Sequence, residues 1–383
     1  MTWQKTMRER FPICRQQCYL DAAFGNGGCK ASQEALELFF EEQFSGRAEG
    51  KKRWNEAADQ VRALSAELLG GVCPEQIAIT KNTVEGLNII ARGFPWKEGD
   101  NVILNDQEHT SNLMPWLALK QQGVDCRIVK AQNAVLTAEM IEEQMDEHTR
   151  MVAVSHVQSA TGYRCDLPKL AQLCRERGVF LVVDAIQSLG VLPCNAKDWG
   201  VDAVAAGGHK GLLAVTGVGI LYTSEKLLSQ LRPLYGGSSP VDSIDRRLWE
   251  NRCSDERSAR KLELSNLNYP GLYALRAGLQ LILDIGVERI WEHIAPLAKT
   301  LNEGLRNMGY AVITPQDREQ SAGIVSLSVP QPLHMKDWFA QQGICISKMD
   351  AGYVRFSLGA FSNDADIQRA LQAAEEYYHL FVK

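Results

Sequence analysis

The stretch VFLVVDAIQSLGVLPCNAKDWGVDAVAAGGHK, residues 179–210, decides the fold. It opens with a continuous apolar run, Val179 to Val183, which ends in Asp184. Such a run predicts a strand that is buried on both faces of a parallel sheet. A second short strand, 203–206, leads into Gly207-Gly208-His209-Lys210. Ligands of open α/β sheets bind beyond the carboxyl ends of the strands, so we expect these polar residues to meet in one crevice.

Outside this stretch, strand-like and helix-like segments alternate along the chain. Strand-like runs stand at 77–80, 101–105, 150–156 and 217–222, and helical periodicity stands at 32–45, 55–69 and 167–177. This rhythm predicts a large, doubly wound α/β domain with a mostly parallel sheet.

The C-terminal part has a different pattern. Helical segments at 271–283, 288–307 and 364–380 enclose short alternating runs at 323–329, 343–347 and 353–358. These runs predict a small α+β domain. We predict a large domain over 20–262 and a small domain built from 1–19 and 263–383, joined by an interdomain helix.

Composition excludes several classes of protein. The chain has 383 residues, 45% hydrophobic and 23% charged, with a net charge of −5 and no basic block. Neither nucleic acid nor a membrane surface is therefore an expected partner. No apolar run approaches the roughly 18 residues of a membrane helix, and the N-terminus has no apolar signal region. The 10 cysteines include no C-x-x-C pair, which favours free thiols in the cytoplasm over disulfides or a metal site.

The side chains at the two strand ends match the needs of pyridoxal phosphate. That cofactor requires a lysine for a Schiff base and an acid that keeps the pyridine nitrogen protonated. Lys210 and Asp184 can supply these groups, and Gln187 can donate to the ring hydroxyl oxygen. Either residue alone would favour a structural reading, with Asp184 capping the next helix and Lys210 lying in a solvated turn. Their order and spacing favour the cofactor.

Three segments together resemble a known family. Asp184-x-x-Gln187, Gly208-His209-Lys210 and the 216–222 segment TGVGILY are similar to the class V aminotransferase and cysteine desulfurase family. The resemblance runs along nearly the whole chain. It implies the fold type I architecture of pyridoxal phosphate (PLP) enzymes and a homodimer with shared active sites.

The resemblance also implies roles for individual residues. The catalytic candidates are Lys210, His109, which would stack on the PLP ring, and Asp184. The cofactor-binding candidates are Lys210, Asp184, Gln187, His209, His109, Thr83, Val84, Ser159 and Asn266. The substrate-binding candidates are Arg355, for the substrate carboxylate, and Ala22 and Ala23. No metal ligand is expected.

Some positions depart from the family pattern. Gly207 replaces a serine before the lysine, so His209 and the backbone would have to compensate for the lost hydroxyl. Ser159 stands where cysteine desulfurases commonly have asparagine. Val84 could offer a phosphate only its backbone N–H. Asn266 replaces a threonine that reaches the phosphate of the neighbouring subunit.

The implied chemistry takes place at the α-carbon of a small amino acid, through an external aldimine. Transamination and a C–S lyase or β-elimination reaction are the leading outcomes, and epimerisation is an alternative. A true cysteine desulfurase that uses Cys345 as persulfide carrier is a further alternative, but that reaction needs a thiol on a mobile loop. Only Cys345 lies between Gly343 and Arg355, in a strand-like segment typical of a packed residue rather than a persulfide carrier.

Two other classes of protein fit the sequence less well. A dinucleotide-dependent oxidoreductase would need a G-x-G-x-x-G fingerprint, which is missing. A non-catalytic scaffold that has lost PLP would be expected to lose Lys210 or Asp184, and both are present. The substrate itself depends on loops at 21–28, 236–262 and 347–353, where Lys348 could bind a side-chain anion.

Overall fold

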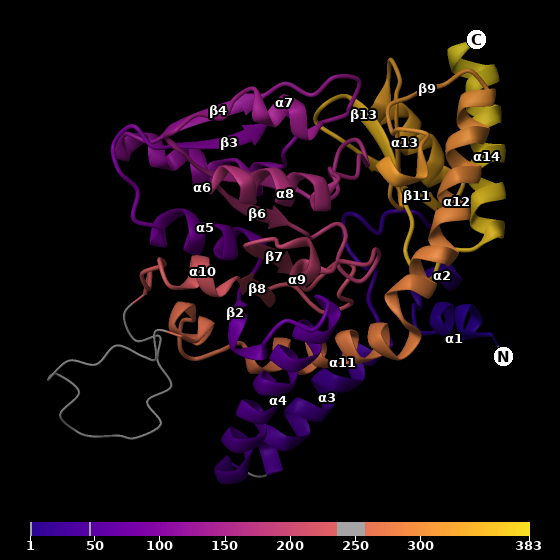
Figure 1. Cartoon of the computed structure of the whole chain (residues 1–383). Coiled ribbons are helices and arrows are strands. Elements are labelled where there is room, and N and C mark those ends of the chain that lie inside the picture. Colours follow the sequence, from indigo (N-terminus) through magenta and orange to yellow (C-terminus); the bar gives the residue numbers. More distant parts are fainter. Residues whose placement is uncertain (1, 46, 236–256) are drawn as a thin grey trace, which may run out of the picture.

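A computed structural model describes residues 2–45, 47–235 and 257–383 (Figure 1). Most of the predicted 236–262 loop, including Cys253, lies outside the described residues. The larger lobe is built on a seven-stranded sheet of spatial order β2-β8-β7-β6-β5-β3-β4. Its strands are β2 (Ile77–Thr80), β3 (Asn101–Asn105), β4 (Asp125–Val129), β5 (Thr149–Ser155), β6 (Phe180–Asp184), β7 (Ala203–Gly207) and β8 (Gly219–Thr223). Strand β8 runs antiparallel to both of its neighbours, and the remaining pairs are parallel.

Strand β6 explains why the sheet is covered on both faces. Leu181 and Val183 belong to one buried cluster, while Phe180 and Val182 belong to another. Because successive strand residues point to opposite faces, an unbroken apolar run needs a core on each side. The first core includes α8 (Leu167–Arg177) and α11 (Tyr269–Ile285), and the second includes α5 (Thr83–Gly93), α6 (Met114–Leu117) and α10 (Glu225–Leu228). The predicted doubly wound, mostly parallel sheet is confirmed.

Short segments fill the rest of the large lobe. They are η1 (Pro74–Gln76), η2 (Thr110–Asn112), η3 (Ala118–Gln122), α7 (Ala138–Glu142), α9 (Ala196–Trp199) and η5 (Ala259–Leu262).

The smaller lobe contains an antiparallel sheet of order β12-β13-β10-β9. Its strands are β9 (Ala311–Val312), β10 (Ile324–Ser328), β12 (Ser347–Lys348) and β13 (Tyr353–Ser357), and its helices are α12 (Val287–Asn307), α13 (Pro332–Gln341) and α14 (Asp364–Tyr377). Two short segments complete it, η6 (Arg318–Gln320) and η7 (Tyr378–Val382).

The start of the chain packs on this smaller lobe. Strand β1 (Cys18–Tyr19) pairs in parallel with β11 (Ile344–Cys345). The preceding helices are α1 (Trp3–Glu9) and α2 (Ile13–Gln16). Arg8 of α1 forms a 2.6 Å ion pair with Asp366 of α14. The segment 343–347, expected to be one strand, is two short strands, because β11 pairs with β1 whereas β12 pairs with β13.

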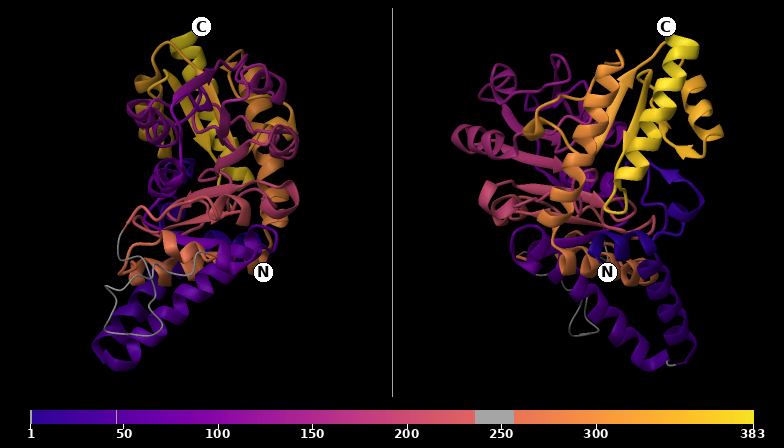
Figure 2. Two further views of the ribbon diagram at one scale, coloured as in Figure 1. Left: turned by 60° about the vertical axis from the view of Figure 1, so that its left-hand side comes forward. Right: turned by 90° about the vertical axis from the view of Figure 1, so that its right-hand side faces the viewer.

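A helical hairpin projects from the body of the large lobe (Figures 1 and 2). It consists of α3 (Lys30–Ser45) and α4 (Arg47–Leu68), and both helices pack against α11. Helix α4 begins well before residue 55, where the apolar periodicity predicted its start. Trp54 accounts for part of this extension, because its ring packs against Phe39 of α3 and Tyr269 of α11.

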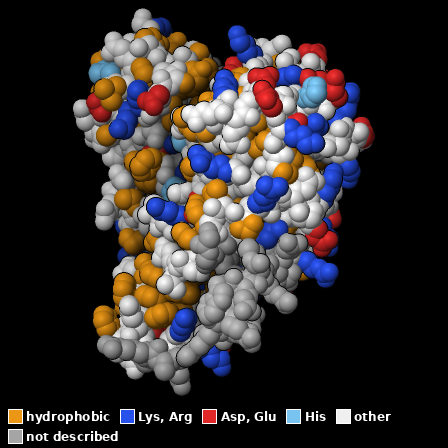
Figure 3. All heavy atoms as spheres, turned by 90° about the vertical axis from the view of Figure 1, so that its left-hand side faces the viewer, with side chains coloured by type: hydrophobic (Ala, Val, Ile, Leu, Met, Phe, Trp, Pro, Cys, Tyr) orange, Lys and Arg blue, Asp and Glu red, His pale blue; other side chains and the backbone are white. Residues whose placement is uncertain are grey.

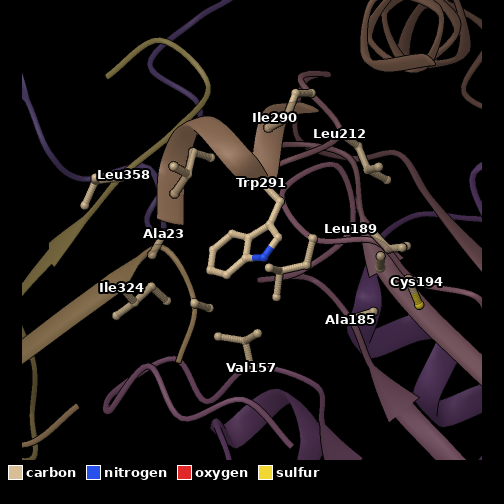
Figure 4. Close-up of a cluster of buried hydrophobic side chains, with 14 of the residues drawn as sticks. Ala23, Val157, Ala185, Leu189, Cys194, Leu212, Ile290, Trp291, Ile324 and Leu358 are labelled. Carbon is tan, nitrogen blue, oxygen red and sulfur yellow. The ribbon is translucent and has the colours of Figure 1, made fainter. Parts of the chain in front are cut away.

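The two lobes share a hydrophobic core. Trp291 of α12 lies among side chains from both, including Val157 and Leu189 on one side and Ile324 and Leu358 on the other (Figure 4). No solvent layer separates the lobes at this core, so the core does not mark a boundary between domains. The domain limits at 19/20 and 262/263 therefore stay predictions. No helix in the described part of the chain is long and apolar enough to cross a membrane.

Candidate active site

A cavity of about 430 Å³ opens at the carboxyl ends of β5, β6 and β7, between the two lobes. The structure brings most of the predicted site residues to its wall: Ala23, Thr83, Val84, His109, Ser159, Asp184, Gln187, His209, Lys210 and Arg355. They come from strand ends of the large sheet, the start of α5 and the small lobe. The expected crevice beyond the strand ends is therefore present.

Asp184 occupies the end of β6, directly between its neighbours in the sheet. It is opposite Ser155 of β5 and Ala205 of β7, and only 3% of its surface is exposed. Its Oδ1 accepts a hydrogen bond from the Ile186 N–H at 3.0 Å. Burial raises the pKa of Asp184, and the nearby charge of Glu108 adds to the effect, while Lys210 opposes it. A cation beside Asp184 would relieve this cost, as a protonated pyridine nitrogen would.

Lys210 follows β7 in a tight turn. The Gly208 N–H donates to the Val218 carbonyl at 2.8 Å, and a Cβ at Gly208 would lie 3.0 Å from the Cβ of Ala214. Among the described residues no hydrogen bond or ion pair engages Lys210 Nζ. Burial lowers the pKa of Lys210, Arg355 lowers it further, and Asp184 opposes both. An uncommitted amine of lowered pKa suits Schiff-base formation.

His109 is fixed by its own turn. Its Nδ1 accepts a hydrogen bond from the Ser111 backbone N–H at 3.1 Å. A backbone N–H can only donate, so the neutral ring carries its proton on Nε2. Partial burial, Lys210 and Arg355 all lower the pKa of His109, although part of its ring surface stays exposed. His109 therefore presents a neutral imidazole with Nε2–H as its donor.

The first turn of α5 forms one end of the cavity. The Asn82 side chain caps the helix by accepting from the Glu85 N–H at 2.9 Å. The Thr83 hydroxyl accepts from the Gly207 N–H, also at 2.9 Å. No described residue accepts from the N–H of Thr83 or Val84. These free donors and the Thr83 O–H can bind a phosphate group.

Arg355 forms the opposite wall and is 4% exposed. Its Nη1 donates to the Ser159 carbonyl at 2.9 Å and its Nη2 to Ser347 Oγ at 3.3 Å. Asp21 Oδ1 lies 3.5 Å from Nη2. Nε is buried without a partner among the described residues. Arg355 is therefore buried, whereas its position in a strand alone was equally compatible with a solvated residue. Its Nε–H remains available as a donor.

The remaining predicted residues differ in their positions relative to the cavity. Gln187 Nε2 donates to the Ala23 carbonyl at 3.1 Å, so one of its two amide hydrogens is already engaged. His209 lines the cavity, and its carbonyl accepts from the Asn26 N–H. Ala22 does not line this cavity, and it lines instead a neighbouring one of about 30 Å³. Asn266 is exposed and lies outside the cavity.

Sequence reasoning missed several residues of the wall. Phe24, Ser155 and Met349 also line the cavity, and Phe24 is 73% exposed. Phe24 and Met349 stand inside loops predicted to shape the pocket, but the loop conformations could not be derived. Cys345 does not line the cavity, nor does any other cysteine in the described ranges.

Comparison with known proteins identifies the family of the chain. The family model for class-V aminotransferases covers residues 29–369. The chain belongs to the class-V aminotransferase family. It is 31% identical to a probable cysteine desulfurase of Methanothermobacter thermautotrophicus, over 84% of this chain and 80% of that one.

Solved structures agree with the predicted fold type. A cysteine desulfurase of Thermococcus onnurineus superposes with a TM-score of 0.89 at 26% identity, over 97% of both chains. A cystine C–S lyase, solved with its product cysteine persulfide, superposes with a TM-score of 0.87 at 24% identity, over 95% of this chain and 99% of that one. The second likeness concerns the fold alone. The protein has the fold type I architecture and belongs among the PLP-dependent enzymes.

The residues present fit PLP. Lys210 offers a free amine, Asp184 a buried carboxylate in need of a cation, and the first turn of α5 free donors for a phosphate. These groups lie around one cavity. The assignment of each role to its residue remains a proposal.

Proposed function

We propose that the protein is a C–S lyase that eliminates sulfur from cysteine or a related small amino acid. One observation carries the proposal: the uncommitted amine of Lys210 and the buried guanidinium of Arg355 line the same cavity. An α-amino acid needs a base near its α-carbon and a partner for its carboxylate. The cysteine desulfurases among the relatives support a sulfur amino acid as substrate.

Each side chain has a defined task in this reaction. Arg355 binds the substrate carboxylate, and PLP, when bound, supplies the electron sink for breaking the Cα–H bond. Lys210 takes the α-proton as general base. Asp184 stabilises the cationic ring nitrogen. His109 donates its Nε2–H toward the leaving sulfur.

The overall reaction balances without an oxidant. The Cα–H and Cβ–S bonds break, and sulfur leaves with the electron pair of the Cβ–S bond. One water then converts the three-carbon fragment into pyruvate and ammonia. A desulfurase would instead pass sulfur to a protein thiol and release alanine.

Elimination is preferred over sulfur transfer to Cys345. That residue belongs to β11, pairs with Tyr19 and is absent from the cavity wall. Burial raises the pKa of its thiol. A neutral thiol held in a strand is a poor nucleophile and cannot carry sulfur outward.

Product analysis tests the proposal. PLP-loaded protein is incubated with L-cysteine and L-cystine, and sulfide, pyruvate, ammonia and alanine are quantified. We expect equal pyruvate and ammonia, no alanine, no turnover by Lys210→Ala, and unchanged rates for Cys345→Ser. Alanine formation that is lost in Cys345→Ser would instead establish a desulfurase. With an added oxo-acid as amino-group acceptor, a panel of amino acids that yields the matching oxo-acids without ammonia would indicate transamination. Loss of optical activity alone would indicate an epimerase.

We also propose a homodimer with shared sites. Hydrophobic side chains are exposed on one face of the molecule (Figure 3), and α3 exposes the large side chains of Leu38, Phe40 and Phe44. Asn266 is exposed outside the cavity of its own chain, as a residue serving a neighbouring site would be. The free thiols of the described cysteines support a reducing, cytoplasmic location.

A further inference from the structure

A buried carboxylate without an assigned role lies directly behind the cavity. Glu108 precedes His109 in the chain, is 7% exposed and does not line the cavity. It accepts five hydrogen bonds. At Oε1 the donors are Asn105 Nδ2 (2.6 Å), Ser155 N (2.7 Å) and Gln158 Nε2 (2.8 Å), and at Oε2 they are Asn112 Nδ2 (2.9 Å) and Ser155 Oγ (2.5 Å).

The directions of these hydrogen bonds are fixed by other contacts. Asn112 Oδ1 accepts from Trp116 Nε1, which can only donate, so the Asn112 amide nitrogen faces Glu108. Asn105 Oδ1 accepts from the Gln107 backbone N–H, which turns its amide nitrogen to Glu108 in the same way. Both oxygens of Glu108 therefore accept hydrogen bonds from backbone or side-chain amide donors, as the oxygens of a deprotonated carboxylate do.

The donors connect the His109 turn to the sheet. Asn105 ends β3 and Ser155 ends β5, next to Asp184 on β6. Asn112 closes the turn twice, because its backbone N–H donates to the His109 carbonyl at 2.8 Å and its side chain donates to Glu108. A single carboxylate therefore joins the turn that carries His109 to two strand ends of the site.

We propose that Glu108 is a positioning residue that holds His109 against the bound cofactor and places a second fixed negative charge behind Asp184. The inference rests on the proposed function of the site, in which His109 and Asp184 act on the cofactor. The charge of Glu108 already reaches Asp184, since it is a cause, after burial, of the raised pKa of that residue. Two carboxylates on one side favour a cationic ring nitrogen more than one does.

The test compares two amide substitutions at equally buried carboxylates. Glu108→Gln keeps the size of the side chain but removes the charge and turns an NH₂ group toward donors. Glu263→Gln is the control, because Glu263 is also 7% exposed but pairs with Arg62 and the Ile79 N–H, away from the cavity. Both variants should unfold at lower urea concentration. Only Glu108→Gln should change the visible circular dichroism of bound PLP, a readout that needs no turnover.

Kinetics provide the second arm. A misplaced catalytic group costs on the order of 10- to 100-fold in rate, so Glu108→Gln should lower kcat by about that factor with little change in KM. In a His109→Phe background there is no imidazole to position and only the loss of the charge behind Asp184 remains, so the further loss should be smaller than in the wild-type background. Equal losses in both backgrounds, or circular dichroism like that of wild type, would overturn the proposal.

The failure of this inference is distinguishable from failure of the proposed reaction. If wild type binds PLP but forms no sulfide or pyruvate, the lyase proposal fails. The circular dichroism comparison still tests the positioning role of Glu108 in that case. If Glu108→Gln does not fold, Asn112→Ala removes one of the five donors and leaves the carboxylate. That variant should shift the dichroism in a smaller degree, and an unchanged spectrum would contradict the positioning role.

Discussion

Arg355 donates to the Ser159 carbonyl and Ser347 Oγ, and it retains a buried Nε that no described residue accepts from. This planar fork is the feature that lysine lacks. We predict that Arg355→Lys raises KM for the amino acid about 10- to 100-fold, as expected for lost hydrogen bonds to a charged group worth ~1.5–3 kcal/mol. The measurement is steady-state kinetics of sulfide release.

A matched arginine is available for comparison. Arg150 also pairs with a carboxylate, Asp100, at 2.8 Å, but it lies outside the cavity wall. Arg150→Lys should leave KM unchanged. A similar KM for wild type and Arg355→Lys would show that the substrate carboxylate binds elsewhere.

His109 yields a prediction about a single proton. The Ser111 N–H occupies Nδ1, and partial burial with two neighbouring cations lowers the pKa of the ring. We predict that at pH 7 the imidazole is neutral with its proton on Nε2. Nitrogen NMR of ¹⁵N-histidine-labelled protein, assigned with His109→Phe, reports the protonation of each nitrogen. A protonated Nδ1 would exclude the donor role of Nε2 proposed above for the neutral ring.

At the scale of elements, the first turn of α5 allows one backbone donor to be removed. Val84 has no polar side chain, so its proposed contribution to phosphate binding is its N–H alone. Proline lacks this N–H but is tolerated in the first turn of a helix. We predict that Val84→Pro weakens PLP binding about 10-fold or more, the effect of losing one hydrogen bond to a charged group. Val84→Ala keeps the N–H and should bind PLP like wild type, and equilibrium dialysis measures both. Equal affinity in both variants would remove Val84 from the phosphate site.

Elements were predictable where a local pattern determines them. The apolar run that ends in Asp184 requires a buried strand whatever its neighbours are, and β6 ends at that residue. Segments that depend on distant partners were not predictable. The split of 343–347 depends on pairing with Cys18 and Tyr19, and the early start of α4 depends in part on contacts of Trp54. The same holds for the site: Glu108 stood next to His109, but its donors come from residues up to 50 positions away.

At the scale of the whole molecule, the buried carboxylate of Asp184 should affect stability. Burial raises its pKa in the folded protein. Between the unfolded pKa of about 3.9 and the higher folded pKa, the folded state binds more protons than the unfolded state. Stability of the PLP-free protein should therefore fall as pH rises through this window.

Asp184→Asn removes the titrating group and should flatten that dependence. Urea unfolding of the PLP-free proteins at about pH 5 and about pH 7.5 measures the change. We expect the variant to gain at least ~1 kcal/mol relative to wild type between the two pH values, since one pKa unit corresponds to ~1.4 kcal/mol. Parallel pH profiles would mean that Asp184 is not destabilised by its burial. The same variant should bind PLP more weakly, because the ring nitrogen loses its partner.

Active sites shared between two subunits lead to a prediction about the activity of hybrid dimers. If Asn266 serves the neighbouring chain, Lys210→Ala and Asn266→Ala disable different parts of each site, and both homodimers should be impaired. In a hybrid dimer, the chain that keeps Lys210 receives an intact Asn266 from its partner, which restores one complete site. Random re-assortment of equal amounts makes half of the dimers hybrid, so about a quarter of wild-type activity should return. Sedimentation velocity verifies that the mixture is dimeric. The control mixes Lys210→Ala with a chain that carries both substitutions. No chain in that mixture keeps Lys210, so no activity should return. A dimeric mixture without recovery would mean that Asn266 acts within its own chain or not at all.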